Sequence, residues 1–376
     1  MTSNPSPGVS VIVPARNEES CLSLCLDSLV TQTGIDFEII VVDDASTDRT
    51  AEIANSFVTD NGGAALQARP RVTVISAPPL PDNWTGKNNA MCAGAKIAKG
   101  KWLLFTDADT VHKPGSLARA VSEAEQHGAA LLSYSPEQEV RSFWEKAVMP
   151  VIFAELATTY PPKKVNAPAS PIAAANGQYL LISREAYDAV GGHTKIASDL
   201  LEDVAMARLV KSSGRKIFFR YGGDAVRTRM YRSWSQMKEG WTKNLAVLFK
   251  RPRALAFVRA SEFLLIFGNL IGAIAAVLTN RLEVASVTFL LSFVVAASAW
   301  ARIRRAHFSF VENLLALGAL AVFAYFLFRS TTLHRNSAVT WKGRQYGVAE
   351  SPHTKSWGAV ERDRLSQHRR VTTPPI

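Results

Sequence analysis

The chain has 376 residues, of which 47% are hydrophobic and 20% are charged, so it is neither a disordered chain nor a collagen-like fibre nor a coiled coil. Its three cysteines are too few for a disulfide-stabilised scaffold. The formal net charge is +11, and the length corresponds to about two domains of ~100–200 residues each.

The first part of the chain alternates apolar β-rich runs with segments of helical periodicity. The predicted strands are residues 9–13, 37–42, 72–75 and 102–106, and the predicted helices are residues 18–30, 48–57 and 88–98. Ser46 is the expected N-cap of the second helix. This alternation predicts an α/β domain in which these strands are parallel and helices cover both faces of the sheet. Ligands of such sheets bind beyond the carboxyl ends of the strands.

Those strand ends are acidic. Glu18 follows the first strand, Asp43 and Asp44 end the second, and Asp107 and Asp109 follow the fourth. Because carboxylates gathered at one edge of a sheet repel one another, we expect a cation among them. Asp107 and Asp109 can offer oxygens to Mn²⁺ or Mg²⁺, with water or substrate phosphates completing the shell. Taken alone, a D-x-D sequence is equally compatible with a turn or a helix cap.

Further along the chain, Glu202 and Asp203 begin a predicted amphipathic helix. They fit either a general base or acids that interact favourably with the helix dipole, and burial should raise the pKa of one of them. Gly177 precedes a predicted strand at 179–182 and lets the backbone approach a ligand closely. His193 fits either a hydrogen bond within its loop or a contact with an acceptor.

Three C-terminal segments lack charged residues. Residues 263–280 and 284–301 each give 18 such positions, and 313–328 gives 16. Since a bilayer core needs about 20 apolar residues and at least about 17, the first two are predicted spans, and the third either crosses or is re-entrant or interfacial. Residues 143–160 are apolar but interrupted by charges and Pro150. We expect them to form a helix in the membrane interface, with a core helix as the alternative.

Basic residues indicate the orientation. Residues 208–259 hold 14 Lys and Arg and two acidic residues, the flank expected on the cytoplasmic side of a first span. A third crossing would place Arg329, Arg335, Lys342 and Arg344 outside, against this rule, so the side of the C-terminus stays open. Membrane lipids that are anionic, or a phosphorylated substrate, account for the basic stretch, and we expect no nucleic-acid partner.

These observations predict three regions. Residues 1–250 are expected to form a cytosolic domain, and residues 347–376 a basic disordered tail. Between them, residues 251–346 are expected to form a multi-pass region of the inner (cytoplasmic) membrane, with helices at about 261–280, 284–301 and 312–329.

Several motifs resemble the nucleotide-sugar half of family 2 glycosyltransferases over residues 8–250, namely VSVIVPARNEES, IIVVDDASTDRT and LLFTDADT. The resemblance implies the GT-A fold, a Rossmann-like mixed sheet, and a UDP-sugar donor. It implies that the uridine is held by Pro14, Arg16, Asn17, Glu18, Asp43, Asp44 and Ser46. Asp107 and Asp109 then hold the diphosphate and the metal ion, Mn²⁺ or Mg²⁺. PDNWTGKNNA resembles the loop that brings Lys87 to the phosphates at a helix N-terminus.

The resemblance also implies the catalytic residues. Inverting transfer to a hydroxyl needs a base opposite the sugar–phosphate bond, and the E-D pair of the family maps onto Glu202 and Asp203, with Asp203 as the base. Gly177 maps onto a contact with the donor sugar or the acceptor.

The sequence departs from the Q-x-x-R-W motif that many members carry. Aligning Trp241 with the tryptophan leaves Met237 and Gly240 in place of the Gln and the Arg. The cation for the diphosphate is then expected from Lys243, Arg229 or Arg227. The missing motif favours transfer of a single sugar.

A narrower resemblance concerns bacterial membrane transferases that glycosylate isoprenoid lipids, the hopanoid-associated and carotenoid (diaponeurosporenoate) glycosyltransferases. It rests on FWEKAVMPVIF, NGQYLLISREAYDAVGGH, LEDVAMARLV and VTWKGRQY. It implies a membrane-anchored enzyme that moves one sugar to an apolar, lipid-like acceptor. One alternative is a processive polysaccharide synthase. Another is a non-catalytic nucleotide-sugar-binding scaffold, which would need neither the E-D pair nor the D-x-D motif.

Overall fold

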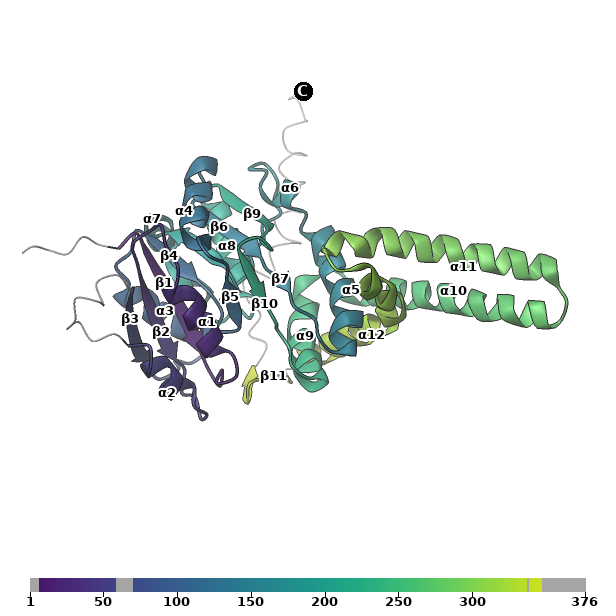
Figure 1. Ribbon diagram of the computed structural model, residues 1–376, viewed down its shortest axis with the longest axis horizontal. Coiled ribbons are helices and arrows are strands. Elements are labelled where there is room, and N and C mark those ends of the chain that lie inside the picture. Colours follow the sequence, from purple (N-terminus) through teal and green to yellow (C-terminus); the bar gives the residue numbers. More distant parts are fainter. Residues whose placement is uncertain (1–6, 59–69, 337, 347–376) are drawn as a thin grey trace, which may run out of the picture.

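The computed structural model describes residues 7–58, 70–336 and 338–346, and the expected tail at 347–376 lies outside them. Figure 1 shows two parts, an α/β part built around a twisted sheet and a helical part from which two long helices project. The N-terminal half of the chain forms most of the α/β part, and the helical part follows in sequence.

Among the described residues, the central sheet has seven strands in the order β3-β2-β1-β4-β8-β6-β9. Their bounds are β1 Val9–Ala15, β2 Phe37–Asp43, β3 Arg71–Ser76, β4 Trp102–Phe105, β6 Leu131–Ser135, β8 Leu180–Ser183 and β9 Ile217–Tyr221. The first four strands are parallel, as the βα alternation predicts, whereas β8 runs antiparallel to both β4 and β6. The sheet is therefore mixed.

Helices cover both faces of this sheet. β1 and β2 are buried on both faces, which explains their nearly continuous runs of Val and Ile. One face packs against α1 (Leu22–Val30) and α4 (Ser116–His127), and the other against α3 (Gly86–Ile97), α7 (Arg184–Ala189) and α8 (Glu202–Ser212). α3 approaches β1 closely because residue 94 is glycine, and a Cβ there would lie 2.6 Å from Ile12 Cγ2.

The second predicted helix begins later than expected. α2 spans Thr50–Asn55, and its N-cap is Arg49, so the prediction of Ser46 as the N-cap is wrong. The reason is local, because the carboxylate of Asp48 accepts hydrogen bonds from the backbone and hydroxyl of Thr50. The Ser46 hydroxyl instead accepts a hydrogen bond of 3.1 Å from the Asn17 backbone, which ties the loop after β2 to the loop after β1.

A small sheet lies between the two parts (Figure 1). It contains β5 (Thr110–His112), β10 (Val226–Thr228) and β7 (Glu137–Gln138), in the order β5-β10-β7. β5 begins directly after the D-x-D sequence, so this sheet holds the chain in place on the C-terminal side of that motif. The short helices α6 (Pro162–Val165) and η2 (Gly192–Ile196) complete the α/β part.

The helical part contains the long apolar helices. Its elements are α5 (Phe143–Thr159), α9 (Trp234–Leu248), α10 (Pro252–Leu278), α11 (Leu282–Ile303), η3 (Arg304–Ala306) and α12 (Phe310–Arg335). Helices at Pro252–Leu278, Leu282–Ala306 and Phe310–Arg335 are long and apolar enough to cross a membrane. α10 and α11 project as a hairpin with only 17% of their apolar windows buried, whereas α12 is 44% buried because it packs against α5, α9 and α10.

For most of the length of α5, the expectation that residues 143–160 form a helix in the membrane interface is wrong. Val148, Val151 and Ile152 in its middle are buried in the same core as α12, so this part is a core helix. Its first residues, Phe143 and Trp144, are exposed at the surface, as is Thr158 near its end. The buried Glu155 pairs with Arg259 of α10 at 2.9 Å and with Arg302 of α11 at 3.0 Å, which joins α5 to both projecting helices.

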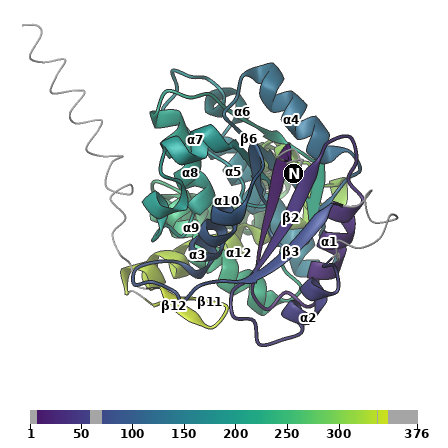
Figure 2. The same cartoon turned by 90° about the vertical axis from the view of Figure 1, so that its left-hand side faces the viewer.

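After α12 the chain forms a β-hairpin of β11 (Val339–Trp341) and β12 (Arg344–Tyr346). Its turn residues Lys342 and Gly343 have φ of 46° and 76°, as a two-residue type I′ turn requires. The hairpin lies beside α3 (Figure 2). The last described residues of the chain therefore return to the α/β part.

Candidate functional site

A cavity of about 1150 Å³ opens at the carboxyl ends of β1 and β4 and is closed on its other side by the helical part. Most of the site residues expected from the sequence line it, although they come from separate parts of the chain. They are Pro14, Arg16, Asn17, Glu18, Asp44, Lys87, Asp107, Asp109, Gly177, Glu202, Asp203, Arg229, Trp241 and Lys243. Asp43 and Ser46 do not line it.

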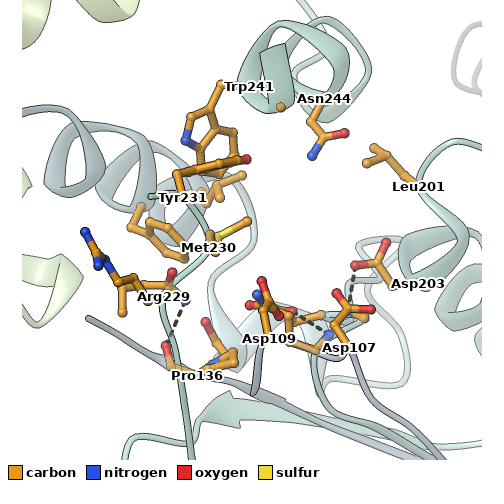
Figure 3. Close-up of a pocket in the computed structure, with 18 of the residues that line it drawn as sticks. Asp107, Asp109, Pro136, Leu201, Asp203, Arg229, Met230, Tyr231, Trp241 and Asn244 are labelled. Carbon is orange, nitrogen blue, oxygen red and sulfur yellow. Dashed lines mark hydrogen bonds between the residues drawn. The ribbon is translucent and has the colours of Figure 1, made fainter. Parts of the chain in front are cut away.

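Asp107 and Asp109 face the cavity from the end of β4 (Figure 3). Burial and the neighbouring charge of Asp107 raise the pKa of Asp109 to about 7, and its buried Oδ1 has no hydrogen-bond partner among the described residues. A pair of carboxylates with an unsatisfied oxygen fits a hard divalent cation. The described residues hold no cluster of three or more His, Cys, Asp or Glu suited to a metal, so water or substrate would supply the other ligands.

Lys87 connects the D-x-D motif to the E-D pair. It lies in the first turn of α3, and its ammonium is 2.7 Å from Asp107 Oδ1 and 2.6 Å from Glu202 Oε1. Burial acts to lower the pKa of Lys87, but the two carboxylates raise it well above its usual value. This lysine is therefore a cation among the acidic strand ends, as their mutual repulsion requires.

The environments of Glu202 and Asp203 separate their pKa values. Burial, followed by the charge of Glu202, raises the pKa of Asp203 to about 6. Burial acts in the same direction on Glu202, but the adjacent ammonium of Lys87 outweighs it and lowers the pKa of Glu202. Such a pair supplies one carboxylate that stays ionised and one that can exchange a proton near neutral pH.

Gly177 allows the backbone to approach this pair. Its backbone N–H donates a hydrogen bond of 2.9 Å to Asp203 Oδ2. A Cβ at this position would lie 3.0 Å from Glu202 Oε1 and 3.2 Å from Lys87 Nζ. Glycine at position 177 therefore lets the backbone approach closely, as expected, and what it approaches is the Glu202–Asp203 pair.

The loops after β1 and β2 hold one another in place. The Arg16 guanidinium donates to the backbone oxygen of Asp44 at 2.6 Å, and the Asn17 side chain accepts from Thr47 N at 2.8 Å. The Asp43 carboxylate accepts a hydrogen bond of 3.4 Å from Ser46 N. Ser46 thus joins the two loops and Asp43 braces the loop after β2, and neither lines the cavity.

The cations expected near the diphosphate are engaged in different ways. Arg229 pairs with the buried Glu145 at 2.9 Å, and Figure 3 shows its side chain directed away from Asp109. Arg227 pairs with Glu139 at 3.2 Å. The half-buried Lys243 lies with its ammonium 5.1 Å from the ring centre of Trp341.

The structure also explains the departure from Q-x-x-R-W. A Cβ at Gly240 would lie 2.5 Å from the ring of Tyr231, so an arginine cannot occupy this position without moving that ring. Trp241 is buried, and its indole N–H donates to Met149 Sδ at 3.4 Å, so it forms part of the cavity wall.

Two cationic residues of the cavity were not found by sequence reasoning. Lys342 donates to Glu18 Oε1 and, at 2.9 Å, to the backbone oxygen of Arg16. Arg344 forms a two-pronged pair with the Asp44 carboxylate, one contact being 3.0 Å. The available signal was a lysine–glycine pair between the β-rich runs VTW and RQY, which is typical of a two-residue hairpin turn.

His193 belongs to the core and not to the cavity. Its ring Nδ1 lies 2.9 Å from the Tyr187 hydroxyl, and burial lowers its pKa to about 3. The first of the two expectations, a local hydrogen bond, is the one that the structure bears out.

Residues 10–191 match the family described as glycosyl transferase family 2. Together with the mixed sheet and the acidic cavity at its strand ends, this match shows that the α/β part contains a family 2 glycosyl transferase domain with a GT-A-like sheet, and that the chain is a glycosyltransferase.

Among curated relatives, the chain is 27% identical over 356 residues to 4,4'-diaponeurosporenoate glycosyltransferase of Staphylococcus aureus strain MRSA252, covering 91% of this chain and 89% of the relative. The same enzyme of strain USA300 is 26% identical over the same shares.

Among solved structures, mannosyltransferase PcManGT from Pyrobaculum calidifontis, in complex with GDP-Man and Mn²⁺, aligns with a TM-score of 0.49 at 20% identity and 87% coverage of both chains. Residues 1–349 of S. aureus TarS, in complex with UDP-GlcNAc, align with a TM-score of 0.39 at 14% identity, covering 91% of this chain and 97% of that one.

Proposed function

We propose that this glycosyltransferase is anchored in the inner membrane and moves a single sugar from a UDP-sugar to an apolar, lipid-like acceptor, with inversion and with Mn²⁺ or Mg²⁺ bound. The observation that carries the proposal is that Asp203 and the D-x-D carboxylates, which come from separate elements of the fold, line one cavity (Figure 3). A base and a diphosphate site must both be within reach of the bound sugar.

On the donor side, Asp107 and Asp109 would hold the divalent ion, and Lys87 lies beside them. When bound, the ion would neutralise charge that develops on the departing diphosphate. The loops after β1 and β2 supply Pro14, Arg16, Asn17, Glu18 and Asp44 to the cavity wall, where they would contact the nucleoside.

On the acceptor side, Asp203 takes the proton from a hydroxyl. The hydroxyl oxygen forms a bond to the anomeric carbon while the bond from that carbon to the diphosphate oxygen breaks. Attack opposite the leaving group inverts the configuration. The raised pKa of Asp203 suits this role because a base near its operating pH transfers protons most effectively.

The acceptor is inferred from the apolar wall of the cavity. Phe153, Leu156, Tyr160, Leu248 and Phe308 line it on the side of α5, α9 and η3. This wall is continuous with the helical part, so an apolar molecule could enter it from a bilayer. The S. aureus relatives are named as glycosyltransferases of 4,4'-diaponeurosporenoate, a carotenoid, which supports the same class of acceptor. The basic stretch at 208–259 supports a cytosolic position of the α/β part.

The test is sugar transfer by purified membranes, with UDP- and GDP-sugars, extracted lipids, and added metal ions or EDTA. Wild type is compared with Asp203→Asn and with Asp188→Asn, a control at an exposed residue of α7. We expect metal-dependent transfer of one sugar, which Asp203→Asn loses while it still binds donor. Full activity of Asp203→Asn would refute the base, and a ladder of products would indicate a processive synthase.

A further inference from the structure

The hairpin of β11 and β12 brings two cations from the C-terminal end of the described chain to the donor side of the cavity. Lys342 and Arg344 contact Glu18 and Asp44, which lie about 300 positions earlier in the sequence. Lys342, Arg344 and Trp341 all line the same cavity as the D-x-D motif. The hairpin is therefore part of the wall of the candidate site.

Lys342 occupies the tip of the hairpin in a conformation that lysine rarely adopts. Its φ of 46° lies in the left-handed region, where glycine is favoured and a Cβ is crowded. This backbone directs the ammonium to Glu18 and to the Arg16 backbone oxygen. Both contacts belong to the loop after β1, one of the two loops proposed to hold the nucleoside.

Two further contacts fix the hairpin in this position. The Arg344 guanidinium pairs with both oxygens of Asp44 and lies against the first residue of α3, where a Cβ on Gly86 would collide with it. On the other side of the hairpin, the ring of Trp341 contacts the ammonium of Lys243 from α9. The tip is thus held between α3 and α9, the helices that carry Lys87 and Trp241.

The donor side of the cavity needs such a cation. A diphosphate carries negative charge into a site that already holds Glu18, Asp44, Asp107 and Asp109, and the position of the usual arginine is occupied by Gly240. Arg227 and Arg229 pair with acids elsewhere, and Lys87 is shared between two carboxylates.

We propose that Lys342 is a ligand of the donor diphosphate and supplies the charge that the arginine of Q-x-x-R-W supplies in other members. This inference rests on the proposed function, because it requires a nucleotide-sugar in the cavity. Without donor the ammonium neutralises Glu18, and on binding it turns to the phosphate oxygens. Arg344 and Trp341 are positioning residues, since they hold the turn that presents Lys342.

The experiment compares the affinity of the full chain, in detergent, for UDP and for uridine by titration calorimetry, with GDP and guanosine as a second pair. Lys342→Gln removes the charge and keeps the length, and Lys342→Arg restores the charge. Lys342→Gly removes the side chain at a position where glycine is favoured, so its fold is not at risk. Lys96→Gln, at an exposed residue of α3, is the matched control.

We expect Lys342→Gln and Lys342→Gly to weaken UDP binding by about tenfold or more, the usual size of a lost charge-assisted hydrogen bond, with uridine changed by less than about twofold. Lys342→Arg and Lys96→Gln should bind UDP like the wild type. Equal weakening of UDP and uridine would overturn the inference, since the hairpin would then only close the cavity. Unchanged UDP binding would overturn it as well.

A double variant separates a phosphate ligand from a residue that merely neutralises Glu18. If Lys342 contacts the diphosphate, Glu18→Gln combined with Lys342→Gln should keep the loss of UDP affinity relative to Glu18→Gln alone. Recovery in the double variant would overturn the direct contact. If the wild-type protein binds no nucleoside diphosphate, the proposed function itself is refuted. If the wild type binds UDP and Lys342→Gln binds it equally well, only the inference about Lys342 is refuted.

Discussion

Replacing Asp203 with asparagine should stabilise the protein at neutral pH while it removes transfer activity. Burial and the charge of Glu202 raise the pKa of Asp203 from 3.8 to about 6. An acid with a raised pKa holds its proton more tightly in the folded than in the unfolded chain. The ionised form of Asp203 therefore lowers the stability of the fold. This loss is complete above the pKa of Asp203 in the folded chain, and it disappears as the pH falls toward the pKa of Asp203 in the unfolded chain.

The magnitude follows from that difference. About two pKa units correspond to ~3 kcal/mol of unfavourable interaction for the ionised side chain. Asparagine removes the charge but weakens the hydrogen bonds that Gly177 N and Val204 N donate to the carboxylate, at a cost of ~1 kcal/mol or more. A net gain of ~1–2 kcal/mol remains, which corresponds to roughly 2–8 °C in Tm for a domain of about 150–250 residues.

The assay is thermal unfolding of the full chain in detergent at about pH 7.5 and at about pH 4.5, where the wild-type carboxyl is mostly protonated. Asp203→Asn should unfold at a higher temperature than the wild type at the higher pH, and the difference should shrink at the lower pH. Asp188→Asn controls for the loss of a surface charge. A variant that is less stable than the wild type at both pH values would refute the reasoning from burial.

Four other outcomes follow from the same geometry. The kcat/KM of the wild type should rise with pH through about 6 and fall to roughly a tenth one unit below that, whereas a flat pH–rate profile would contradict an ionised base. Gly177→Ala places a methyl group 3.0 Å from Glu202 Oε1, so steady-state kinetics should show about a tenfold loss of kcat with donor affinity retained, and unchanged kcat would count against this packing. Glu155→Ala leaves Arg259 and Arg302 with Glu262 as their remaining carboxylate partner and should cost ~2 kcal/mol, seen as a lower Tm. Glu139→Ala, at a more exposed pair, should cost less than ~1 kcal/mol. EDTA should abolish sugar transfer and Mn²⁺ or Mg²⁺ should restore it, whereas full activity in EDTA would exclude the metal requirement.

The sequence predicted those features that depend on local pattern. Val9–Val13 and Phe37–Val42 are nearly continuous apolar runs. The acids that follow them, with those after β4, had to lie at one edge once the strands were parallel. The cavity with Asp107, Asp109 and Glu202 followed from this rule together with the resemblance. Local pattern gave no indication that β8 inserts antiparallel between β4 and β6, because this pairing joins segments far apart in sequence.

Other features depend on the packing of distant side chains. Ser46 failed as an N-cap because Asp48 competes for the start of α2. The block at Gly240 comes from the ring of Tyr231, and the contacts of Lys342 with Glu18 cross most of the chain. None of these follows from periodicity or from the spacing of a motif.

The hairpin contact also restricts how the chain can thread a bilayer. The chain enters the first long apolar helix at Pro252 and is back beside Glu18 at Lys342, so it has traced a closed loop. A closed loop crosses any plane an even number of times, so three complete crossings are excluded for a bilayer that leaves the α/β part on one side. With α10 and α11 as the crossing pair, the half-buried α12 stays on the same side as the active cavity. Arg329 and Arg335 then lie on the same side as the basic flank of the first span, which is the cytosolic side in the proposed orientation.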